Sequence, residues 1–596
     1  MKPSLQSALT FVELALFLSL CIRLLRHTKY EKAPKVQRPT FGDCALAIGA
    51  AGLLTALRGP LPFLTYVGCG VLLTLLLILW LDVALYGSFS FELGLSGITD
   101  VVLSNLVTEV LRMRCARQFF LSHRIFSLLP LMLPLCLLLL FLQADTPQHS
   151  VLLVVLSAYF ASAFHQTAWG GHSSDAVRPS STRRALLHDF VRPRLPVIAS
   201  DFCVRPEHLC LFEPQTPCRV PSESHGLLRG ASVVLLTFES LGSSQLTSDG
   251  AVTPFLTSLC SDPHSITSDT HVSLAPLTNA AHVALYYSRH KLLADCDGNR
   301  PPHSHVEQLA QAGYLNLYLT ATTAEHYGLA TILRQAGFAH LIDGLTLSQT
   351  AATGHVTDSV LLRAGLAQLS LQLQQHSGPF FLHVHAANSH LPYHIDEPER
   401  FNRHDSKDDC GRFLNSIEET DALFNTLWNA LRELEQQRGV TKESPLLFVG
   451  SDHGQSFGEH GYRSHGSAVI AAQTQVPMVF HHPRLSQEVI PFSTHFQVLP
   501  TVLDLLGIPM AGDCGSSILA EPTPPRHLLW DGQPSRSTSG CLGLLLGDRK
   551  YSLDLIRDTC IESDWNDRAA RQLDGEERCY FEGLIGLVAR HAGVLR

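Results

Sequence analysis

Residues 451–466, SDHGQSFGEHGYRSHG, contain the side-chain types that bind metal ions and move protons. They follow the apolar run 445–450, which predicts a buried strand. Asp452 and His453 therefore stand at the carboxyl end of a strand, where an α/β sheet opens into a cleft. A carboxylate and an imidazole are both ligands of Zn²⁺ and related ions. His465 follows twelve residues after His453, across a glycine-rich loop, and the whole stretch predicts a metal site.

An acidic residue farther upstream offers another ligand. The segment 231–244, ASVVLLTFESLGSS, predicts a strand built on the apolar run 233–236, with Glu239 at its carboxyl end. Taken alone, Glu239 is better explained as a surface residue at the end of a strand. It becomes a candidate metal ligand only together with Asp452 and His453.

A hydroxyl at the start of a predicted helix is the candidate nucleophile. Thr278 follows Pro276 and Leu277, and the run 280–287 has helical composition, which predicts that Thr278 is an N-cap or first-turn residue. The free N–H groups at a helix start bind phosphate well. A neutral hydroxyl is a weak nucleophile that metal coordination activates. The alternative interpretation of Thr278 is a simple helix cap.

Together these segments resemble the alkaline phosphatase superfamily, in particular its membrane-anchored sulfatase-like branch of lipoteichoic acid synthases, phosphoglycerol transferases and phosphoethanolamine transferases. The resemblance covers roughly 230–510. It implies an α/β alkaline-phosphatase-like domain with a central mixed sheet. It also implies one divalent ion, Zn or Mn, bound by Glu239, Thr278, Asp452 and His453, with Thr278 as nucleophile. The sulfatase signature Cys-x-Pro-x-Arg is absent, so formylglycine chemistry is not expected.

A third segment, GPFFLHVHAANSHLPYHI, adds candidate substrate contacts. Its run 380–384 predicts another strand, which leads into the turn that contains His390. The resemblance places a phosphate-binding histidine in such a turn, and His390 matches it. His383 and His385 lie on one face of the strand and are interpreted as core histidines, and His394 is a weaker match.

The remaining predicted site residues face the transferred group. His390 and His465 are expected to bind the phosphate or to act as acid and base. Arg463 would add positive charge there, although a solvated loop arginine explains it equally well.

Two segments are expected to support the fold rather than the chemistry. The stretch 411–434 has apolar residues at helical spacing, and Asn415 and Asp421 within it are interpreted as structural. The stretch 496–509, FQVLPTVLDLLGIP, resembles a core segment of sulfatase-like proteins. Residues 515–596 match no pattern that we can name.

The first part of the chain has the composition of a membrane domain. Five segments are candidate spans, at about 8–25, 42–58, 64–86, 126–143 and 150–166. We therefore expect a transmembrane domain over 1–166, a linker with an interfacial segment over 167–229 and a sulfatase-like catalytic domain over 230–596.

Two signals disagree on the topology. Basic residues cluster between the first and second spans and between the third and fourth, which places the catalytic domain in the cytoplasm. The resemblance implies an extracytoplasmic domain. An even number of cysteines in this region, ten, favours disulfide bonds in an oxidising compartment: Cys203, Cys210, Cys218, Cys260, Cys296, Cys410, Cys514, Cys541, Cys560 and Cys579. No Asn-x-Ser/Thr sequon occurs, which favours a bacterial envelope. We expect a multi-pass protein of the bacterial inner membrane with its catalytic domain outside the cytoplasm.

The net charge of -9 gives no sign of nucleic-acid binding. The resemblance instead implies a transferase that moves a phospholipid head-group phosphate, phosphoethanolamine or phosphoglycerol, through a phospho-threonine intermediate to a glycan or lipid acceptor. Two alternatives stay open. One is a sulfatase-like hydrolase or phosphodiesterase on the same metal site, and the other is a catalytically inactive membrane scaffold.

Overall fold

A computed structural model describes most of the chain from residue 222 onward, and these residues belong to one compact unit, 195–554 with 559–596. Within that part it leaves out 247–249, 291–302, 325–328, 348–355, 392, 441–443, 511–514, 521–524, 533–540, 555–558, 593 and 595–596. The five predicted spans, the domain 1–166 and the linker up to 221 lie outside the described residues. Among the helices that the structure describes, none is both long enough and apolar enough to cross a bilayer.

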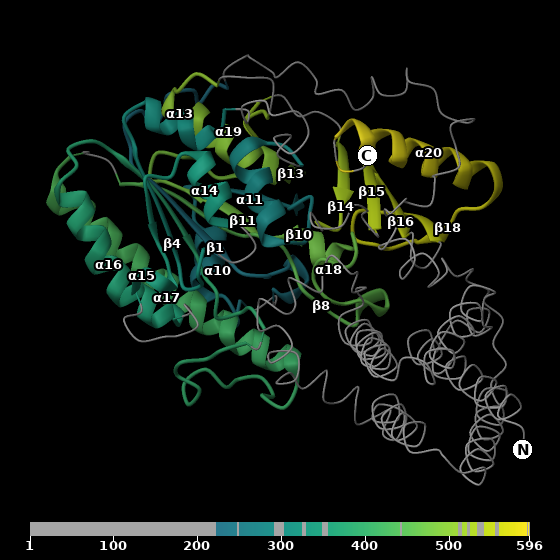
Figure 1. The fold of residues 1–596 in the computed structure, drawn as a ribbon, viewed down its shortest axis with the longest axis horizontal. Coiled ribbons are helices and arrows are strands. Elements are labelled where there is room, and N and C mark those ends of the chain that lie inside the picture. The colour runs from purple at the N-terminus through teal and green to yellow at the C-terminus, as the bar shows by residue number, and fades with distance from the viewer. Residues whose placement is uncertain are drawn as a thin grey trace, which may run out of the picture. The chain divides into compact units, whose positions relative to one another are not determined.

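A mixed eight-stranded sheet forms the centre of the described unit (Figure 1), as predicted. Its strand order is β12 (Glu488–Ile490), β2 (Ser265–Ser268), β11 (Met478–His481), β7 (Leu446–Ser451), β1 (Val233–Phe238), β6 (Phe380–His385), β4 (Leu315–Thr320) and β5 (His340–Ile342). Strand β11 runs antiparallel to both of its neighbours. The strands from β7 to β5 are all parallel, so their carboxyl ends lie at one edge.

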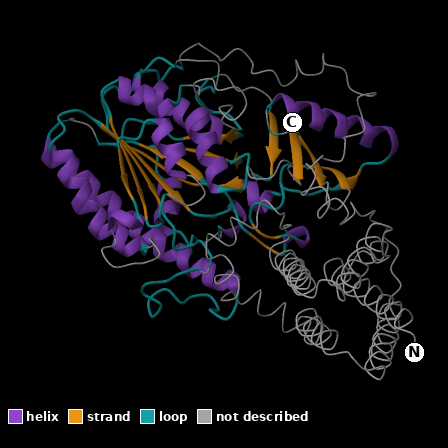
Figure 2. Ribbon diagram, in the orientation of Figure 1, coloured by secondary structure: helices purple, strands orange, loops and turns teal. Residues whose placement is uncertain are grey.

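Successive side chains of a strand point to opposite faces of the sheet, and this explains the layers of helices on the two faces. Val233 and Leu235 of β1 pack into one buried apolar cluster, whereas Val234 and Leu236 pack into another. The first cluster includes residues of α11 (Thr278–Tyr287), α13 (His305–Gln311), α14 (Leu329–Ala336) and α19 (His495–Leu506). The second includes residues of α10 (Pro254–Cys260), α16 (Asp358–Gln374) and α17 (Asp409–Arg438), with α15 (Gly344–Leu347) beside α16. Figure 2 shows helices on both sides of the sheet.

The predicted supporting segments are helices, and their polar residues hold loops in place. The predicted helix 411–434 lies within α17, and the segment 496–509 forms most of the buried helix α19. Asp421 accepts hydrogen bonds from the N–H groups of Phe255 (2.7 Å) and Leu256 (3.1 Å) at the start of α10. Asn415 bonds both backbone groups of His404. The structural interpretation of Asp421 and Asn415 is confirmed.

The C-terminal segment, in which the sequence shows no pattern that we can name, forms a second sheet covered by a helix. The antiparallel strands are β14 (Arg526–Trp530), β15 (Cys541–Leu546), β16 (Arg549–Asp554), β17 (Thr559–Ser563) and β18 (Arg571–Gln572), and the helix is α20 (Gly575–His591). Leu529 and Leu545 pack against Val469 and Ile470, which follow the predicted metal-site loop. The second sheet therefore supports one wall of that loop.

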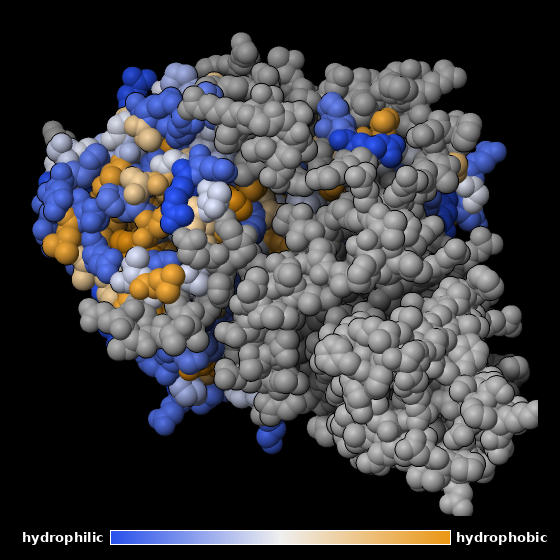
Figure 3. Space-filling model, viewed as in Figure 1, coloured by the Kyte–Doolittle hydropathy of each residue, from blue (hydrophilic) through white to orange (hydrophobic). Residues whose placement is uncertain are grey.

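The remaining helices and strands of the described residues are two to four residues long. They are η3 (Ser243–Gln245), β3 (His271–Val272), β8 (Ser456–Phe457), η5 (Glu459–Gly461), β9 (Arg463–Ser464), α18 (Ala471–Thr474), β10 (Gln475–Val476) and β13 (Ser493–Thr494). On the face shown in Figure 3, hydrophilic and hydrophobic residues are interspersed over the described surface. The large hydrophobic side chains that stand exposed, Leu345, Leu371 and Val489, lie on three different elements.

Three of the ten cysteines contradict the predicted disulfide framework. Cys260, Cys410 and Cys560 are free thiols. Burial raises the pKa of Cys260 and of Cys410 to about 11 and that of Cys560 to about 12, so these thiols stay protonated and unreactive at neutral pH. Cys203, Cys210, Cys218, Cys296 and Cys514 lie outside the described residues.

Candidate active site

The candidate residues meet at the carboxyl edge of the three central strands. Glu239 directly follows β1, and Asp452 and His453 directly follow β7. The parallel register pairs Phe238 with Ser451, so the residues after these two strands leave the sheet side by side. Odd-numbered residues of β1 face the layer that contains α11, which directs Glu239 toward the start of that helix.

The four predicted metal ligands are close together. His453 Nε2 lies 3.3 Å from Asp452 Oδ2 and 3.5 Å from Glu239 Oε1. Thr278 Oγ1 lies 3.3 Å from His453 Nε2 and 3.4 Å from Glu239 Oε2. The two carboxylates and His453 are buried, and Thr278 is half-buried. One ligand atom from each of Glu239, Asp452 and His453 lies within 4.8 Å of the others.

A carboxylate oxygen of Asp452 without a hydrogen-bond partner in the described part of the chain is consistent with a cation-binding site at this position. Asp452 Oδ1 accepts hydrogen bonds from the N–H groups of Ser240 (3.0 Å) and His453 (2.7 Å). Asp452 Oδ2 is buried and has no hydrogen-bond partner among the described residues. Burial and the negative charge of Glu239 raise the pKa of Asp452. A buried, unpartnered carboxylate oxygen beside another carboxylate and an imidazole fits a divalent ion such as Zn²⁺ or Mn²⁺.

The turn after β1 is shaped for this arrangement. Ser240 has a φ of 64°, a left-handed conformation that is costly for a residue with a side chain. This turn directs the Ser240 N–H to Asp452, and the Ser240 hydroxyl donates to Glu239 Oε1 at 2.7 Å. One residue thereby bonds both candidate carboxylates.

Thr278 is the first residue of α11, in agreement with the predicted helix start. Leu277 is the N-cap and contributes no side-chain cap, so the N–H groups of the first turn are not capped by that side chain and can face an anion. A phosphoryl group bound next to Thr278 would meet both the helix start and the candidate ligands.

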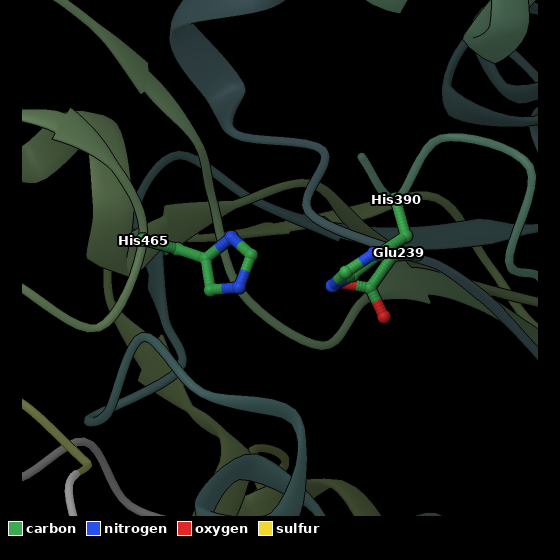
Figure 4. Close-up of side chains that lie close together, drawn as sticks. All are labelled: Glu239, His390 and His465. Carbon is green, nitrogen blue, oxygen red and sulfur yellow. The ribbon is translucent and has the colours of Figure 1, made fainter. Parts of the chain in front are cut away.

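In the close-up view His465 lies across from His390 and Glu239, which overlap in this orientation (Figure 4), and one ligand atom from each of the three residues lies within 4.8 Å of the others. His465 Nδ1 lies 2.8 Å from Gln455 Oε1, and Gln455 Nε2 donates to Tyr393 at 2.8 Å. His465 Nδ1 therefore carries the proton, which leaves Nε2 with a lone pair. His390 Nδ1 likewise faces a carbonyl, that of Leu391, at 3.0 Å.

The structure does not bring Arg463 to the other candidates. Its side chain is exposed on β9, whereas the next residue, Ser464, faces inward. Within the described part of the chain no hydrogen bond or ion pair joins the Arg463 side chain to the site.

His385 is a site residue that the sequence interpretation placed in the core. It is buried, as expected, but its Nε2 lies 3.1 Å from Glu239 Oε2 and 3.8 Å from Asp452 Oδ2. Burial alone would raise the pKa of Glu239, but the hydrogen bond from His385 and the nearby imidazoles hold this pKa well below its usual range. The register pairs His385 with Thr237, two residues before Glu239, and this pairing cannot be read from one strand alone.

Asp358 is a second residue that the sequence did not single out. Its carboxylate accepts hydrogen bonds from the N–H groups of Ala387 (2.9 Å) and Asn388 (3.0 Å). The next residue, Ser389, donates its hydroxyl to the carbonyl of Glu239 at 2.7 Å. Asp358 thus holds the turn from which His390 enters the site.

The described part of the chain is an α/β domain whose sheet edge holds a cluster of carboxylates, imidazoles and a hydroxyl. The sulfatase family model matches residues 231–508, and these residues form a sulfatase domain of the alkaline phosphatase superfamily. The predicted resemblance to that superfamily is confirmed. Its members are enzymes that use a divalent metal ion.

Solved structures share this fold at low sequence identity. The lipoteichoic acid synthase LtaP from Listeria monocytogenes aligns with a TM-score of 0.50 at 16% identity, covering 65% of this chain and 98% of LtaP. A protein of the alkaline phosphatase superfamily from Vibrio parahaemolyticus gives the same score and identity, with coverage of 65% and 96%. The integral membrane protein lipooligosaccharide phosphoethanolamine transferase A from Neisseria meningitidis aligns at 16% identity with a TM-score of 0.49, covering 83% and 95%. No curated protein matches the chain in a sequence search.

Proposed function

We propose that this protein transfers a phospholipid head-group phosphate to a glycan or lipid acceptor through a covalent intermediate on Thr278. One observation carries the proposal: Thr278 Oγ1 stands at a helix start, 3.4 Å from Glu239 and 3.3 Å from His453. A hydroxyl placed among candidate metal ligands at the start of a helix is positioned for attack on phosphorus.

The first displacement forms a bond between Thr278 Oγ1 and the phosphorus of the donor lipid. The bond from phosphorus to the diacylglycerol oxygen breaks, and the head-group phosphate stays on Thr278. Glu239, Thr278, Asp452 and His453 would hold a divalent cation, which when bound would lower the pKa of the Thr278 hydroxyl and stabilise the negative charge that develops on oxygen. The first turn of α11 binds the phosphoryl oxygens through its N–H groups.

The imidazoles of His390 and His465 act as proton acceptors and donors in both displacements. With Nδ1 of each ring directed at an oxygen atom, Nε2 can take the proton of the attacking hydroxyl and return one to the leaving oxygen. In the first displacement the protons move from Thr278 to diacylglycerol. In the second they move from the acceptor hydroxyl to Thr278, which is released for another cycle.

The expected transmembrane domain 1–166 and linker 167–229 fit this chemistry, because the donor lipid and the diacylglycerol product are both membrane components. The proposal therefore includes a multi-pass inner-membrane protein with its catalytic domain, 230–596, outside the cytoplasm. Phosphoethanolamine and phosphoglycerol are both compatible head groups for the site.

Intact mass spectrometry of the full-length chain tests the proposal. The protein is loaded with Zn²⁺ or Mn²⁺ and incubated, without acceptor, with phosphatidylglycerol or with phosphatidylethanolamine. We expect an added mass equal to one head-group phosphate, on Thr278. The Thr278→Ala variant should carry no adduct, and Thr278→Ser should still form one because it keeps the hydroxyl.

Other outcomes identify the alternatives. Full turnover by Thr278→Ala would refute the covalent mechanism. Release of free head-group phosphate that does not change when a glycan acceptor is added would identify a hydrolase. A purified chain that binds no metal and forms no adduct would indicate an inactive scaffold.

A further inference from the structure

A continuous line of hydrogen bonds runs from Glu239 into the protein interior. His385 Nε2 lies 3.1 Å from Glu239 Oε2, and His385 Nδ1 lies 3.0 Å from Thr237 Oγ1. The same hydroxyl lies 2.8 Å from His383 Nε2, and His383 Nδ1 lies 2.7 Å from Tyr286 Oη. All four side chains are at least 97% buried, with exposed fractions of 3% for His385, 1% for Thr237 and 0% for His383 and Tyr286. We call these four residues the Tyr286 relay.

Alternation along the strands creates the relay. Odd-numbered residues of β1 and β6 face the layer that contains α11, as the packing of Leu235 and Phe381 shows. Thr237, His383 and His385 are therefore a polar stripe inside an otherwise apolar layer. Burying such a stripe is costly unless each polar atom has a partner. The relay and Glu239 together provide partners for both nitrogens of both rings.

The relay keeps the same contact with Glu239 in either protonation state of His385. When His385 is neutral, Nε2–H donates to Glu239, the Thr237 hydroxyl donates to His385, and Tyr286 donates to His383. When His385 carries two protons, it donates to both Glu239 and Thr237, and the other bonds reverse direction. The Thr237 hydroxyl also lies 3.4 Å from the carbonyl of Val384, but its contacts with the two rings are shorter.

A parallel line of hydrogen bonds braces the nucleophile. His282 Nδ1 lies 2.7 Å from the carbonyl of Thr278, and His282 Nε2 lies 3.0 Å from Tyr318 Oη. The carbonyl must accept, so Nδ1 carries the proton and Tyr318 donates to Nε2. The rings of His282 and His383 are stacked, with centroids 5.3 Å apart and planes 17° apart. Burial lowers the pKa of both histidines, which agrees with neutral rings.

We propose that Thr237, His383 and Tyr286 are positioning residues that fix the His385 ring and, through it, the Glu239 carboxylate for metal binding. Glu239 Oε2 is held by His385, which leaves Oε1 directed toward His453. Outer groups that orient metal ligands typically contribute about 10–100-fold to metal affinity. The inference rests on the metal-binding part of the proposed function and is independent of the group transferred.

Two substitutions at Thr237 separate hydrogen bonding from packing. Thr237→Val keeps the branched shape but removes the hydroxyl that joins the two rings. Thr237→Ser keeps the hydroxyl but removes a packed methyl group. We expect Thr237→Val to weaken Zn²⁺ and Mn²⁺ affinity by about 10–100-fold, with Thr237→Ser close to wild type. Tyr286→Phe, which removes only the last partner, should give a smaller loss than Thr237→Val.

The measurement is metal affinity of the purified full-length chain, by competition with a chromogenic chelator. Wild-type affinity in Thr237→Val would overturn the relay, as would an equal loss in Thr237→Ser and Thr237→Val, because packing would then explain the effect. Thermal unfolding of the metal-free variants checks that each is folded. A wild-type chain that binds neither ion would overturn the metal site itself, an outcome distinct from failure of the relay alone.

Discussion

The Asp452→Asn variant should change stability in opposite directions with and without metal. In the wild-type chain Asp452 Oδ2 is buried without a hydrogen-bond partner and lies close to His453 and the carboxylate of Glu239. Asparagine keeps the carbonyl oxygen that accepts from Ser240 and His453. Its amide group replaces the orphaned oxygen with a donor, and Glu239 can accept that hydrogen bond.

The magnitude follows from these contacts. An unsatisfied buried polar group costs about 1–3 kcal/mol, so the metal-free variant should be more stable than the metal-free wild type by about that amount. Saturating metal stabilises the wild type by about 2.7 kcal/mol when its concentration is 100 times Kd. The variant loses a charged ligand and should gain much less, so the order of stability reverses when metal is added.

Denaturant unfolding of the full-length chain in chelator and in excess Zn²⁺ or Mn²⁺ measures both effects. Asp421→Asn is the matched control. Asp421 is a buried carboxylate of α17 that accepts hydrogen bonds from two backbone N–H groups of α10, and its substitution should not alter the effect of metal. A metal-free Asp452→Asn protein that is less stable than wild type and gains as much from metal would refute the reasoning.

Two further predictions concern residues that support the site. Burial raises the pKa of Asp421 to about 7, above its unfolded value, so this carboxyl stabilises the fold at low pH and the contribution is lost as pH rises toward 7. Relative to Asp421→Asn, the wild type should lose about 3 kcal/mol between pH 5 and pH 8, measured by urea unfolding, and a pH-independent difference would contradict this. In Gly454→Ala, the new Cβ would lie 2.2 Å from the carbonyl oxygen of Ala472, so we expect a loss of about 1–3 kcal/mol and weaker stabilisation by metal. Gly365→Ala is the control, because its Cβ would meet only side-chain atoms of Leu319 at 3.2 Å and Leu361 at 3.5 Å. Equal losses in both variants would argue against a role of Gly454 in the site.

The residues at the ends of the central strands could be found from sequence because each carries its own local signal. Glu239, Thr278 and Asp452 each adjoin an apolar run or a helix start, and parallel strands bring their carboxyl ends to one edge. The alternation of apolar residues fixes the faces of β1, and the observed clusters agree with it. Neighbouring residues in the sequence are thus sufficient to predict these strands and this helix, and the candidate ligands next to them.

The C-terminal sheet was not predicted because its strands are separated by segments without a clear period. Its role depends on contacts that are distant in sequence. Lys550 of β16 is buried, pairs with Asp567 and lies 3.4 Å from the carbonyl of Val469. Asp567 also accepts from the N–H of Ala471 at 2.5 Å. These bonds connect the second sheet to the segment that follows His465. No local sequence pattern predicts them.

Arg463 and His385 show the limit of local reasoning most directly, because both were assigned from chemistry and strand face alone. Arg463 has the right charge and the right neighbours in sequence, but β9 turns its side chain outward. His385 has the pattern of a core histidine, and it is one, yet the register of β1 with β6 brings its ring to Glu239. Burial and function are not alternatives at this sheet edge, because a buried carboxylate requires buried donors. A histidine on the inner face of a strand next to a catalytic edge is therefore better judged by its cross-strand partner than by its own periodicity.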